Sequence, residues 1–316
     1  MKIVVLDDRT VNPGLHDWEP LRALGECTVH EHTPPEGTVE RALGAPVVLT
    51  DRTVMDGPVL EQLDGLRYVG ILATGCNTVD LATARRRGVT VTNIPGYATL
   101  SVAQHAFALL LELTSRVSHY DGHVRAGRWV ESRMTCVREE PQVELAGLTM
   151  GIIGLGRSGT RVAELARAFG MTVIACTRTP KNLPDIEEMD LDSLLTRSDV
   201  VSIHVPLTDQ TEGMISAERI AKMKRTAFLI NTARGAVVDG AALAEALNAA
   251  RIAGAAVDVL ATEPPGADDP LVAARNCYIT PHLAWSTVAA RRRLLETAVG
   301  NLRAFLAGRP VNVVTT

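Results

Sequence analysis

The segment GLGRSG, residues 154–159, is the feature that most narrows what this chain can fold into. It follows an apolar run, residues 148–153, and leads into an amphipathic helical pattern over residues 157–170. In the spacing G-x-G-x-x-G, the glycines permit a tight turn, let a pyrophosphate approach the backbone, and let helix and strand pack closely. The helix N-terminus then offers N–H groups and a positive dipole end to phosphates. The pattern therefore predicts a dinucleotide-binding turn; the alternative is a tight turn that binds no ligand.

Strand-like and helical patterns alternate along the rest of the chain. Before the turn, we expect strands at residues 2–6, 45–50, 66–73 and 89–94, with helices at 19–25 and 80–88. After it, we expect strands at 171–177, 200–207, 226–233 and 254–260, with helices at 190–199, 218–224 and 240–250. Strands that alternate with helices in this way form parallel sheets. The predicted fold class is α/β, with two doubly wound parallel sheets.

Two long helical patterns divide the chain into units. Residues 101–125 are rich in Ala and Leu and have no proline, and no glycine until near their end, so we expect one long helix there. A second helical stretch covers residues 286–306, and the final VNVV resembles a strand that returns to the first unit. We therefore predict one unit from residues 1–98 and 286–316, with a second unit, residues 99–285, inserted in it. The cleft between such units is an expected ligand site.

Composition limits the partners of the chain. With 316 residues, 46% of them apolar, it has the length for about two domains with sizeable cores. The net charge of −4 provides no basic surface for nucleic acid. The N-terminal MKIVVLDD has the pattern of a strand rather than of a signal peptide, and no apolar run approaches the ~20 residues of a membrane span. Five scattered cysteines without C-x-x-C spacing argue against disulfides and a zinc site. We expect a cytoplasmic protein that binds neither nucleic acid nor membrane.

Three polar residues follow predicted strands after the glycine turn. Arg234, in NTARG, carries a planar guanidinium that suits a carboxylate. His282, in YITPHLAW, has the side chain best suited to proton transfer near neutral pH, and a nearby carboxylate such as Glu263, in ATEPP, would orient it and favour its protonated form. Each alone has an ordinary structural explanation: a helix cap, a hydrogen-bonded histidine or a solvated glutamate. Because ligands gather at the carboxyl ends of strands in open α/β sheets, the three together predict hydride transfer to and from a 2-hydroxy acid.

The end of the strand after the glycine turn bears on the choice of cofactor. A site that prefers NAD usually has Asp or Glu there, bonded to the ribose 2′-hydroxyl. In this chain Thr177 stands at that place, 21 residues after Gly156, and Arg178 follows it. No carboxylate repels a 2′-phosphate, and Arg178 offers a cation. We therefore predict that NADP(H) is favoured over NAD(H); the alternative is that Arg178 is a solvated charge and that NAD binds without acidic help.

Several longer segments resemble the D-isomer-specific 2-hydroxyacid dehydrogenases over nearly the whole chain. They are LATGCNTVD (72–80), IPGYATLSVAQHAFALLLEL (94–113), GLGRSG (154–159), VPLTDQTEGMI (205–215), NTARGAVVDGAAL (231–243), VDVLATEPP (257–265) and TPHLAWST (280–287). Within that family, ATGCNTVD, SVAQH, NCYITPHLAW and AFLAGRPVNVV resemble segments of glycerate dehydrogenases, also called hydroxypyruvate reductases.

The resemblance implies a role for each unit and for the three polar residues. Residues 1–98 with 286–316 would form a flavodoxin-like substrate-binding domain, and residues 99–285 a Rossmann cofactor domain. Arg234 would anchor the substrate's carboxylate and carbonyl, and His282 would be the general acid in reduction and the general base in oxidation, with Glu263 as its partner. The substrate-binding residues implied are Ala73, Thr74, Gly75, Arg234 and His282.

The resemblance also implies a set of cofactor contacts. Thr232 and Asp258 would position the nicotinamide carboxamide, while Val205 and Pro206 would line the adenine. The full implied set is Gly154, Gly156, Arg157, Ser158, Gly159, Thr177, Arg178, Val205, Pro206, Thr232, Ala233, Asp258, His282 and Ala284.

The expected reaction is the NAD(P)-dependent reduction of a small 2-oxo acid to the D-2-hydroxy acid, and the reverse, by a homodimer without a metal. Hydroxypyruvate and glyoxylate are the leading substrates. The polar segment 131–144 is expected to be a loop or lid, and it departs from the Cys-aromatic-Trp pattern of many glycerate dehydrogenases, because Val137 and Arg138 follow Cys136. The alternatives are an NAD(H)-binding regulatory or corepressor-like protein of the same fold, and a phosphoglycerate-type or phosphite-type dehydrogenase.

Overall fold

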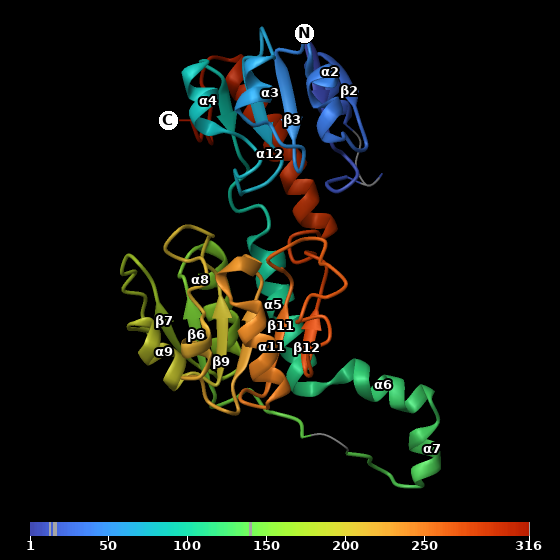
Figure 1. Cartoon of the computed structure of the whole chain (residues 1–316), viewed down its shortest axis with the longest axis vertical. Coiled ribbons are helices and arrows are strands. Elements are labelled where there is room, and N and C mark those ends of the chain that lie inside the picture. The colour runs from blue at the N-terminus through green and yellow to red at the C-terminus, as the bar shows by residue number, and fades with distance from the viewer. Residues whose placement is uncertain (13, 15–17, 139–140, 316) are drawn as a thin grey trace. The chain divides into compact units, whose positions relative to one another are not determined.

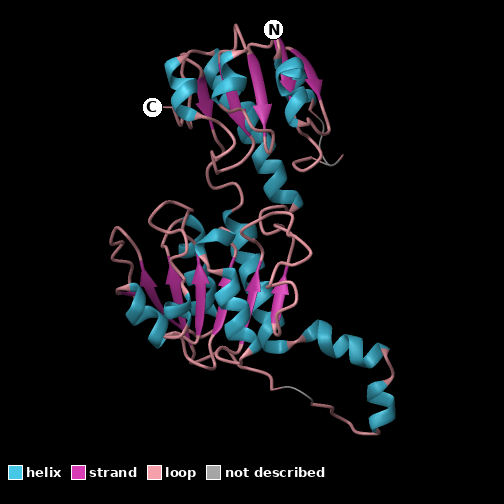
Figure 2. Cartoon of the chain, in the orientation of Figure 1, coloured by secondary structure: helices cyan, strands magenta, loops and turns pink. Residues whose placement is uncertain are grey.

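The chain forms two compact units. The computed structural model describes residues 1–12, 14, 18–138 and 141–315. Unit 1 comprises Met1–Ala98 with Trp285–Thr316, and unit 2 is Thr99–Ala284. Each unit has its own parallel sheet with helices packed against it, so the predicted α/β class is confirmed (Figure 2). Within the described ranges, no helix has both the length and the apolar character needed to span a membrane.

Unit 1 is built on a five-stranded sheet in the order β2-β1-β3-β4-β5, which is that of flavodoxin-like folds. The strands are β1 (Lys2–Val5), β2 (Glu26–Val29), β3 (Val47–Thr50), β4 (Tyr68–Ile71) and β5 (Thr90–Thr92). The helices are α1 (Glu19–Arg22), α2 (Thr38–Ala42), α3 (Gly57–Glu61), α4 (Leu81–Arg86) and α12 (Val288–Leu306).

Alternate residues of the central strands in unit 1 face two separate cores. Ile3 and Leu49 pack with Leu294 of α12 on one face, whereas Val4 and Val48 belong to the core that α3 and α4 cover on the other face. Because both faces are covered, every residue of β3 and β4 is buried. This burial explains why both strands appear in the sequence as continuous apolar runs instead of an alternating pattern.

Unit 2 is built on a seven-stranded sheet in the order β12-β11-β10-β9-β6-β7-β8 (Figure 1). The strands are β6 (Thr149–Ile153), β7 (Thr172–Cys176), β8 (Glu187–Glu188), β9 (Val200–Ile203), β10 (Phe228–Asn231), β11 (Gly254–Val257) and β12 (Cys277–Ile279). The helices are α5 (Thr99–Ser115), α6 (Val117–Arg125), α7 (Arg128–Ser132), α8 (Arg157–Ala168), α9 (Leu191–Arg197), α10 (Ala217–Ile220) and α11 (Gly240–Asn248). The chain reverses its direction of travel across the sheet between β6 and β9, as in a Rossmann fold extended by one strand.

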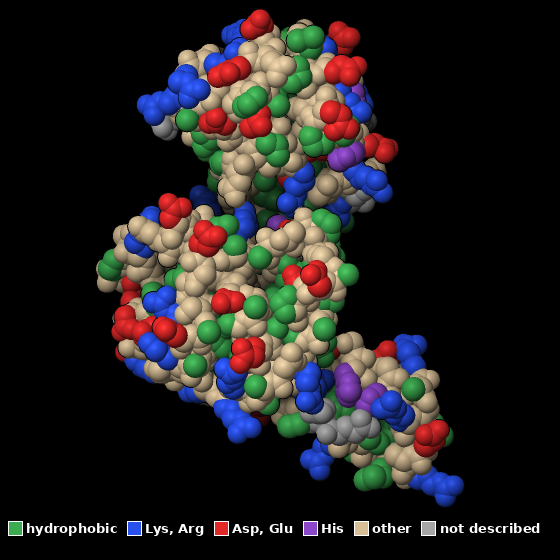
Figure 3. Space-filling model, viewed as in Figure 1, with side chains coloured by type: hydrophobic (Ala, Val, Ile, Leu, Met, Phe, Trp, Pro, Cys, Tyr) green, Lys and Arg blue, Asp and Glu red, His purple; other side chains and the backbone are tan. Residues whose placement is uncertain are grey.

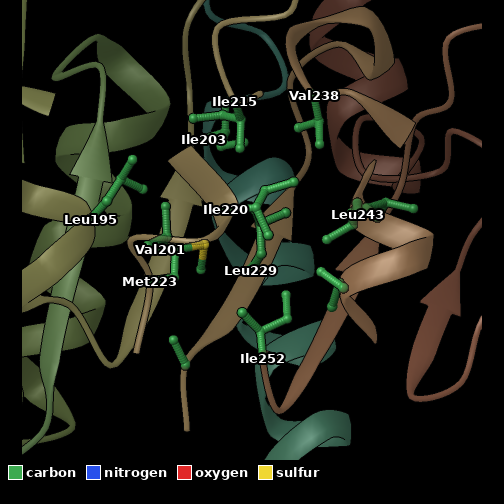
Figure 4. Packing of buried hydrophobic residues seen from close by; sticks show 14 of the residues in the cluster. Leu195, Val201, Ile203, Ile215, Ile220, Met223, Leu229, Val238, Leu243 and Ile252 are labelled. Carbon is green, nitrogen blue, oxygen red and sulfur yellow. The ribbon is translucent and has the colours of Figure 1, made fainter. Parts of the chain in front are cut away.

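Two cores cover the faces of the second sheet. On one face, Leu195 of α9, Ile220 of α10 and Leu243 of α11 pack against Val201 and Leu229 of the sheet (Figure 4). On the other face, apolar residues of α5 and α8 pack against β6, β7, β10 and β11. The sheet is thereby fixed as a rigid platform, and its carboxyl edge carries most of the candidate site residues.

The prediction of one long helix over residues 101–125 is wrong. The chain adopts a left-handed conformation at Arg116, with φ of 54°, which ends α5 and starts α6 in a new direction. The Glu112 side chain accepts hydrogen bonds from the amide and hydroxyl of Ser118 at the start of α6. The physical reason for the break is burial: α5 packs on the sheet as far as Thr114, whereas α6 buries none of its residues.

Two further expectations need correction. The final VNVV is not a strand: it makes a single antiparallel bridge between Val313 and Thr92, because Asn312 turns the chain with φ of 54°. It does return to unit 1, as expected. The segment 131–144 was expected to be a loop or lid, but its first two residues are the end of α7. Residues 139–140 of that segment lie outside the described residues.

Candidate active site

The glycine turn joins β6 to α8 and has little room for larger residues. A Cβ atom at Gly154, where φ is 97°, would lie 2.7 Å from the carbonyl oxygen of His204, and one at Gly159 would lie 2.0 Å from the carbonyl oxygen of Gly154. At Gly156 nothing lies within 4 Å of the position of a Cβ atom. The first and third glycines are therefore required by packing, while the second keeps an open space that a side chain would fill.

The open space lies at the N-terminus of α8. Gly156 is the N-cap of this 12-residue helix, and no side chain caps it. The amides of Arg157 and Ser158 in the first turn are consequently available to an anion. A phosphate group fits this cradle because it needs N–H donors and close backbone approach, and both are present. The prediction that these residues contact the cofactor remains a prediction.

The two residues that directly follow β7 are not acidic. Thr177 and Arg178 follow the strand, and the Arg178 side chain is exposed. The nearest acidic residue on the neighbouring strand is Glu188, whose Oε1 accepts hydrogen bonds of 2.8 Å from the amides of Lys181 and Asn182. Glu188 therefore stabilises the loop after β7, and its Oε1 atom already accepts two hydrogen bonds from that loop.

Arg234 follows β10 in an extended conformation and is half-buried. Its Nη1 donates to the carbonyl of Ala233 at 2.7 Å, and Asn231 brackets the turn by bonding the Ala233 amide and the Arg234 carbonyl, each at 3.0 Å. A Cβ atom on Gly235 would lie 1.9 Å from the carbonyl carbon of Leu260. The backbone next to Arg234 thus packs directly on the segment that leads to Glu263.

Glu263 and His282 form a hydrogen-bonded pair. The Nδ1 atom of His282 lies 2.5 Å from Oε2 of Glu263, while Oε1 of Glu263 accepts from the amide of Leu260 at 3.1 Å. The His282 side chain is 24% exposed and the Glu263 side chain is 32% exposed, so the pair is accessible to solvent. His282 adopts φ of 55°, which is uncommon for any residue except glycine. Since Nδ1 is held by Glu263, Nε2 is the ring atom left for a substrate.

Asp258, at the end of β11, is buried with only 1% of its side chain exposed. Its carboxylate accepts hydrogen bonds from the amides of Leu283 and Ala284 at 2.7 and 2.8 Å and from the Thr280 hydroxyl at 2.6 Å. Burial by itself would raise the pKa of Asp258, but these bonds and the neighbouring His105 outweigh it and hold the pKa below its ordinary value. Asp258 is therefore ionised and bound to the segment that carries His282.

Several predicted contacts lie at the neighbouring strand ends. Thr232 is buried, and among the described residues its hydroxyl has no hydrogen-bond partner. A buried hydroxyl without a partner costs free energy, so the position fits a ligand that supplies one, such as a carboxamide. Val205 and Pro206 follow β9, and the Pro206 carbonyl accepts from the Thr211 hydroxyl at 2.6 Å.

The predicted carboxylate-binding loop belongs to unit 1 and follows β4. The Thr74 hydroxyl donates to the Ile94 carbonyl at 2.8 Å, and the Ala73 carbonyl accepts from the Ile94 amide at 2.9 Å. These bonds hold the loop in place. In the part of the chain that the structure describes, the amides of Thr74 and Gly75 donate no hydrogen bond.

Sequence reasoning missed His105 and Thr280, which contact Asp258. His105 lies in the SVAQH segment of α5, far from the strand ends in sequence, and only packing of α5 on the sheet brings it there. The polar pair Gln104–His105, directly before the apolar run of α5, was the available signal. Thr280 directly precedes Pro281 and His282 in the same segment as the predicted site.

Comparison with known proteins agrees with this geometry. The family model for the NAD-binding domain of D-isomer-specific 2-hydroxyacid dehydrogenases matches residues 107–284, which is more than half of the chain. The chain is 44% identical over 320 residues to a hydroxypyruvate reductase of Blautia hydrogenotrophica, with 99% of each protein covered. The chain belongs to the D-isomer-specific 2-hydroxyacid dehydrogenases.

Two further proteins are similar to the chain over nearly its whole length. A glycerate dehydrogenase of Methylorubrum extorquens is 40% identical over 316 residues, covering 99% of this chain and 98% of that protein. A solved acyclic imino acid reductase, in complex with NADPH and D-Arg, is similar with a TM-score of 0.90 and 30% identity, over 99% of this chain and 100% of its own. The predicted family and enzyme class are therefore confirmed: the chain is an oxidoreductase that uses a nicotinamide cofactor and interconverts 2-oxo acids and D-2-hydroxy acids.

Proposed function

We propose that the chain reduces a small 2-oxo acid, with hydroxypyruvate and glyoxylate as leading substrates, through Arg234, Glu263 and His282. The observation that carries this proposal is the Glu263–His282 hydrogen bond at the ends of adjacent strands, next to the turn that holds Arg234. The substrate class is supported by the names of the two curated relatives, a hydroxypyruvate reductase and a glycerate dehydrogenase.

Each side chain has a distinct part in the reduction. The nicotinamide cofactor, when bound, supplies the hydride that reaches the carbonyl carbon. Nε2 of His282 donates a proton to the carbonyl oxygen, so that the product is a hydroxyl group. The carboxylate of Glu263 orients the ring and stabilises the imidazolium before the proton leaves. Arg234 holds the substrate carboxylate and stabilises the charge that develops on the oxygen, since its guanidinium is always protonated.

We propose binding roles for residues of unit 2 and, separately, for one loop of unit 1. We assign the cofactor's pyrophosphate to the α8 N-terminus at Gly156, and the nicotinamide carboxamide to the unpartnered hydroxyl of Thr232. We also assign the substrate carboxylate to the amides of Thr74 and Gly75, because these donors make no hydrogen bond within the described ranges.

We further propose that NADP(H) is favoured over NAD(H). The support is the end of β7, where Arg178 is exposed and Oε1 of the neighbouring Glu188 is engaged by two loop amides. A 2′-phosphate would meet the Arg178 cation at this strand end, where neither Thr177 nor Arg178 supplies a carboxylate. The structurally similar imino acid reductase binds NADPH.

The chain is also proposed to act as a homodimer in a reducing, cytoplasmic compartment. The arm, defined as α6 and α7, buries none of its residues and exposes Val124, Trp129 and Val130. Helices this short are marginal in water by themselves, so we infer that a second copy covers them. An apolar groove of about 430 Å³ between α5 and α8 offers a surface for that contact and is lined by Leu100, Phe107, Leu111, Leu165 and Phe169. All five cysteines are free thiols.

The test is a panel of 2-oxo acids assayed with NADPH and with NADH. Hydroxypyruvate, glyoxylate, pyruvate and 3-phosphohydroxypyruvate distinguish the proposed substrates from those of a lactate or phosphoglycerate type of enzyme. We expect the highest kcat/KM with hydroxypyruvate or glyoxylate and NADPH. A preference for the phosphorylated acid would refute the substrate assignment, and a strong preference for NADH would refute the cofactor assignment.

A further inference from the structure

One buried carboxylate fixes the segment that carries His282. Asp258 accepts hydrogen bonds from the amides of Leu283 and Ala284 through its two carboxylate oxygens, at 2.7 and 2.8 Å. Its backbone carbonyl accepts from the His282 amide at 2.8 Å. Asp258 therefore accepts hydrogen bonds from three consecutive amides, those of His282, Leu283 and Ala284. They lie on either side of the His282 Cα atom, where the backbone is left-handed.

A histidine on another element completes this cluster. Nε2 of His105, on α5, lies 2.9 Å from the Thr280 hydroxyl and 3.4 Å from Oδ1 of Asp258. The residues of α5 that face the sheet, such as Ala103 and Ala106, belong to the core, whereas His105 is beside that stripe and 23% exposed. The first helix of unit 2 is thereby connected to the end of β12.

The direction of each hydrogen bond follows from the charge of Asp258. An ionised carboxylate only accepts, so the Thr280 hydroxyl must give its single proton to Oδ1, which lies 2.6 Å away. The Thr280 oxygen then has only lone pairs left for His105. Nε2 of His105 therefore carries a proton and donates it to Thr280, and this donor also faces the negative charge of Asp258.

We propose that His105 is a positioning residue for His282, acting through Thr280 and Asp258. A left-handed conformation at a residue with a Cβ atom persists only where the surrounding structure holds it in place. Without the donor at His105, the Thr280 oxygen loses the hydrogen bond that it accepts, and the Asp258 carboxylate loses a neighbouring positive dipole. The segment 280–284 then has less to hold the His282 ring where a proton transfer needs it. This inference rests on the proposed acid–base role of His282.

The test compares variants that remove or keep the donor, because an Asp258 variant would lose too many bonds to be informative. His105→Leu removes the donor, whereas His105→Gln keeps an N–H group at nearly the same reach. We expect His105→Leu to lower kcat for reduction roughly 10-fold to 100-fold, as misplacement of a reacting group does, with little change in KM for either substrate. His105→Gln should recover most of kcat. Thr280→Val should resemble His105→Leu, Thr280→Ser should resemble the wild type, and the double variant should lose little more than either single one.

The possible outcomes distinguish a failure of the positioning role of His105 from a failure of the acid–base role of His282. Wild-type kcat in His105→Leu, equal losses in His105→Leu and His105→Gln, or additive losses in the double variant would each overturn it while leaving His282 as the acid–base group. An active His282→Asn variant would overturn the acid–base role and this inference together. Thermal unfolding of each variant shows whether a lower kcat reflects loss of the folded state.

Discussion

At the scale of single residues, the most unusual feature is the backbone of His282. Eight residues other than glycine, among those described, have positive φ, and His282 is one of them; its ring also hydrogen-bonds the carboxylate of Glu263. The left-handed conformation directs the ring so that Nδ1 meets Glu263 and Nε2 stays available. A sequence shows the residue type at this position but not its backbone angle, so the orientation of the ring could not have been predicted.

His282→Asn separates the chemistry of the ring from its backbone. Asn tolerates a left-handed conformation better than most residues, so the segment should stay folded while the proton donor is lost. We expect kcat for reduction to fall at least ~10²-fold, in line with the loss of general acid catalysis. The matched control is His32→Asn, at an exposed position in unit 1, which should leave turnover unchanged. Near-normal turnover of His282→Asn in steady-state assays would remove His282 from the mechanism.

Glu263→Gln removes a charge while keeping a side chain of the same shape. The neutral amide can still accept a hydrogen bond from Nδ1 of His282, but it no longer supplies the negative charge that makes this bond charge-assisted. We therefore expect kcat for reduction to fall roughly 10-fold, because the general acid loses its charged partner while the ring stays in place. The measurement is steady-state kcat and KM for the oxo acid at neutral pH. An unchanged kcat would contradict a functional Glu263–His282 pair.

At the scale of elements, the dinucleotide turn depends on the strand beside it. His204 follows β9, and its amide donates to the Ile153 carbonyl at 2.8 Å. Its carbonyl oxygen lies 2.7 Å from the position that a Cβ atom of Gly154 would take. Its ring bonds the Ser202 hydroxyl at 2.8 Å. Burial lowers the pKa of His204 from 6.5 to about 4, so the ring is neutral at neutral pH. The glycine spacing identified the turn, but not the histidine that supports it.

The lowered pKa of His204 makes folding sensitive to acid. The unfolded chain protonates this residue first as the pH falls below about 6.5, so stability that is complete above this pH is lost progressively down to about pH 4. Because the residue as a whole is half-buried, the full effect of the shift is reduced, and we expect a loss on the order of 1–2 kcal/mol. His204→Gln, which keeps a partner for Ser202, should show a smaller loss between these two pH values. Urea unfolding at both pH values measures it, and an equal loss in the variant would contradict the assignment.

Burial distinguishes the elements that were predicted correctly from those that were missed. Strands β3, β4, β9 and β10 are buried throughout and appear as apolar runs in the sequence. Strands β2 and β8 are at sheet edges, have mixed burial, and were not predicted. The break at Arg116 was missed for a related reason: residues 101–125 keep a helical pattern, but only the first part has a sheet to pack against.

At the scale of the whole molecule, one alternating pattern of strands and helices forms two sheets with different strand orders. The strand orders place the reversal between β1 and β3 in unit 1 and between β6 and β9 in unit 2. In open α/β sheets, ligands bind beyond the carboxyl ends of the strands near such a reversal, as the position of the glycine turn illustrates. The arm leaves the sheet layers of unit 2 and, as Figure 3 shows, carries hydrophobic and histidine side chains on its surface.

Removing an apolar contact from the arm tests the proposed homodimer. Val130 is 82% exposed, so Val130→Asp should not disturb the fold of one copy, but it should weaken association by placing a charge in the contact. We expect light scattering to show a wild-type mass about twice the 33.8 kDa of one chain, and a lower mass for the variant at the same concentration. Val54→Asp, at another exposed valine in unit 1, is the control. A monomeric wild type, or an undiminished dimer in Val130→Asp, would rule the arm contact out.

The sequence alone determined the fold class, the glycine turn and the identity of the three polar residues. These depend on local patterns: periodic burial, glycines where a side chain would collide, and polar residues at strand ends. Only the tertiary structure decided which groups meet. It joined Glu263 to His282, bound Asp258 to segment 280–284 and brought His105 from α5 to Thr280. Such contacts depend on how helices pack on the sheet and on single backbone angles, and neither leaves a periodic signal in the chain.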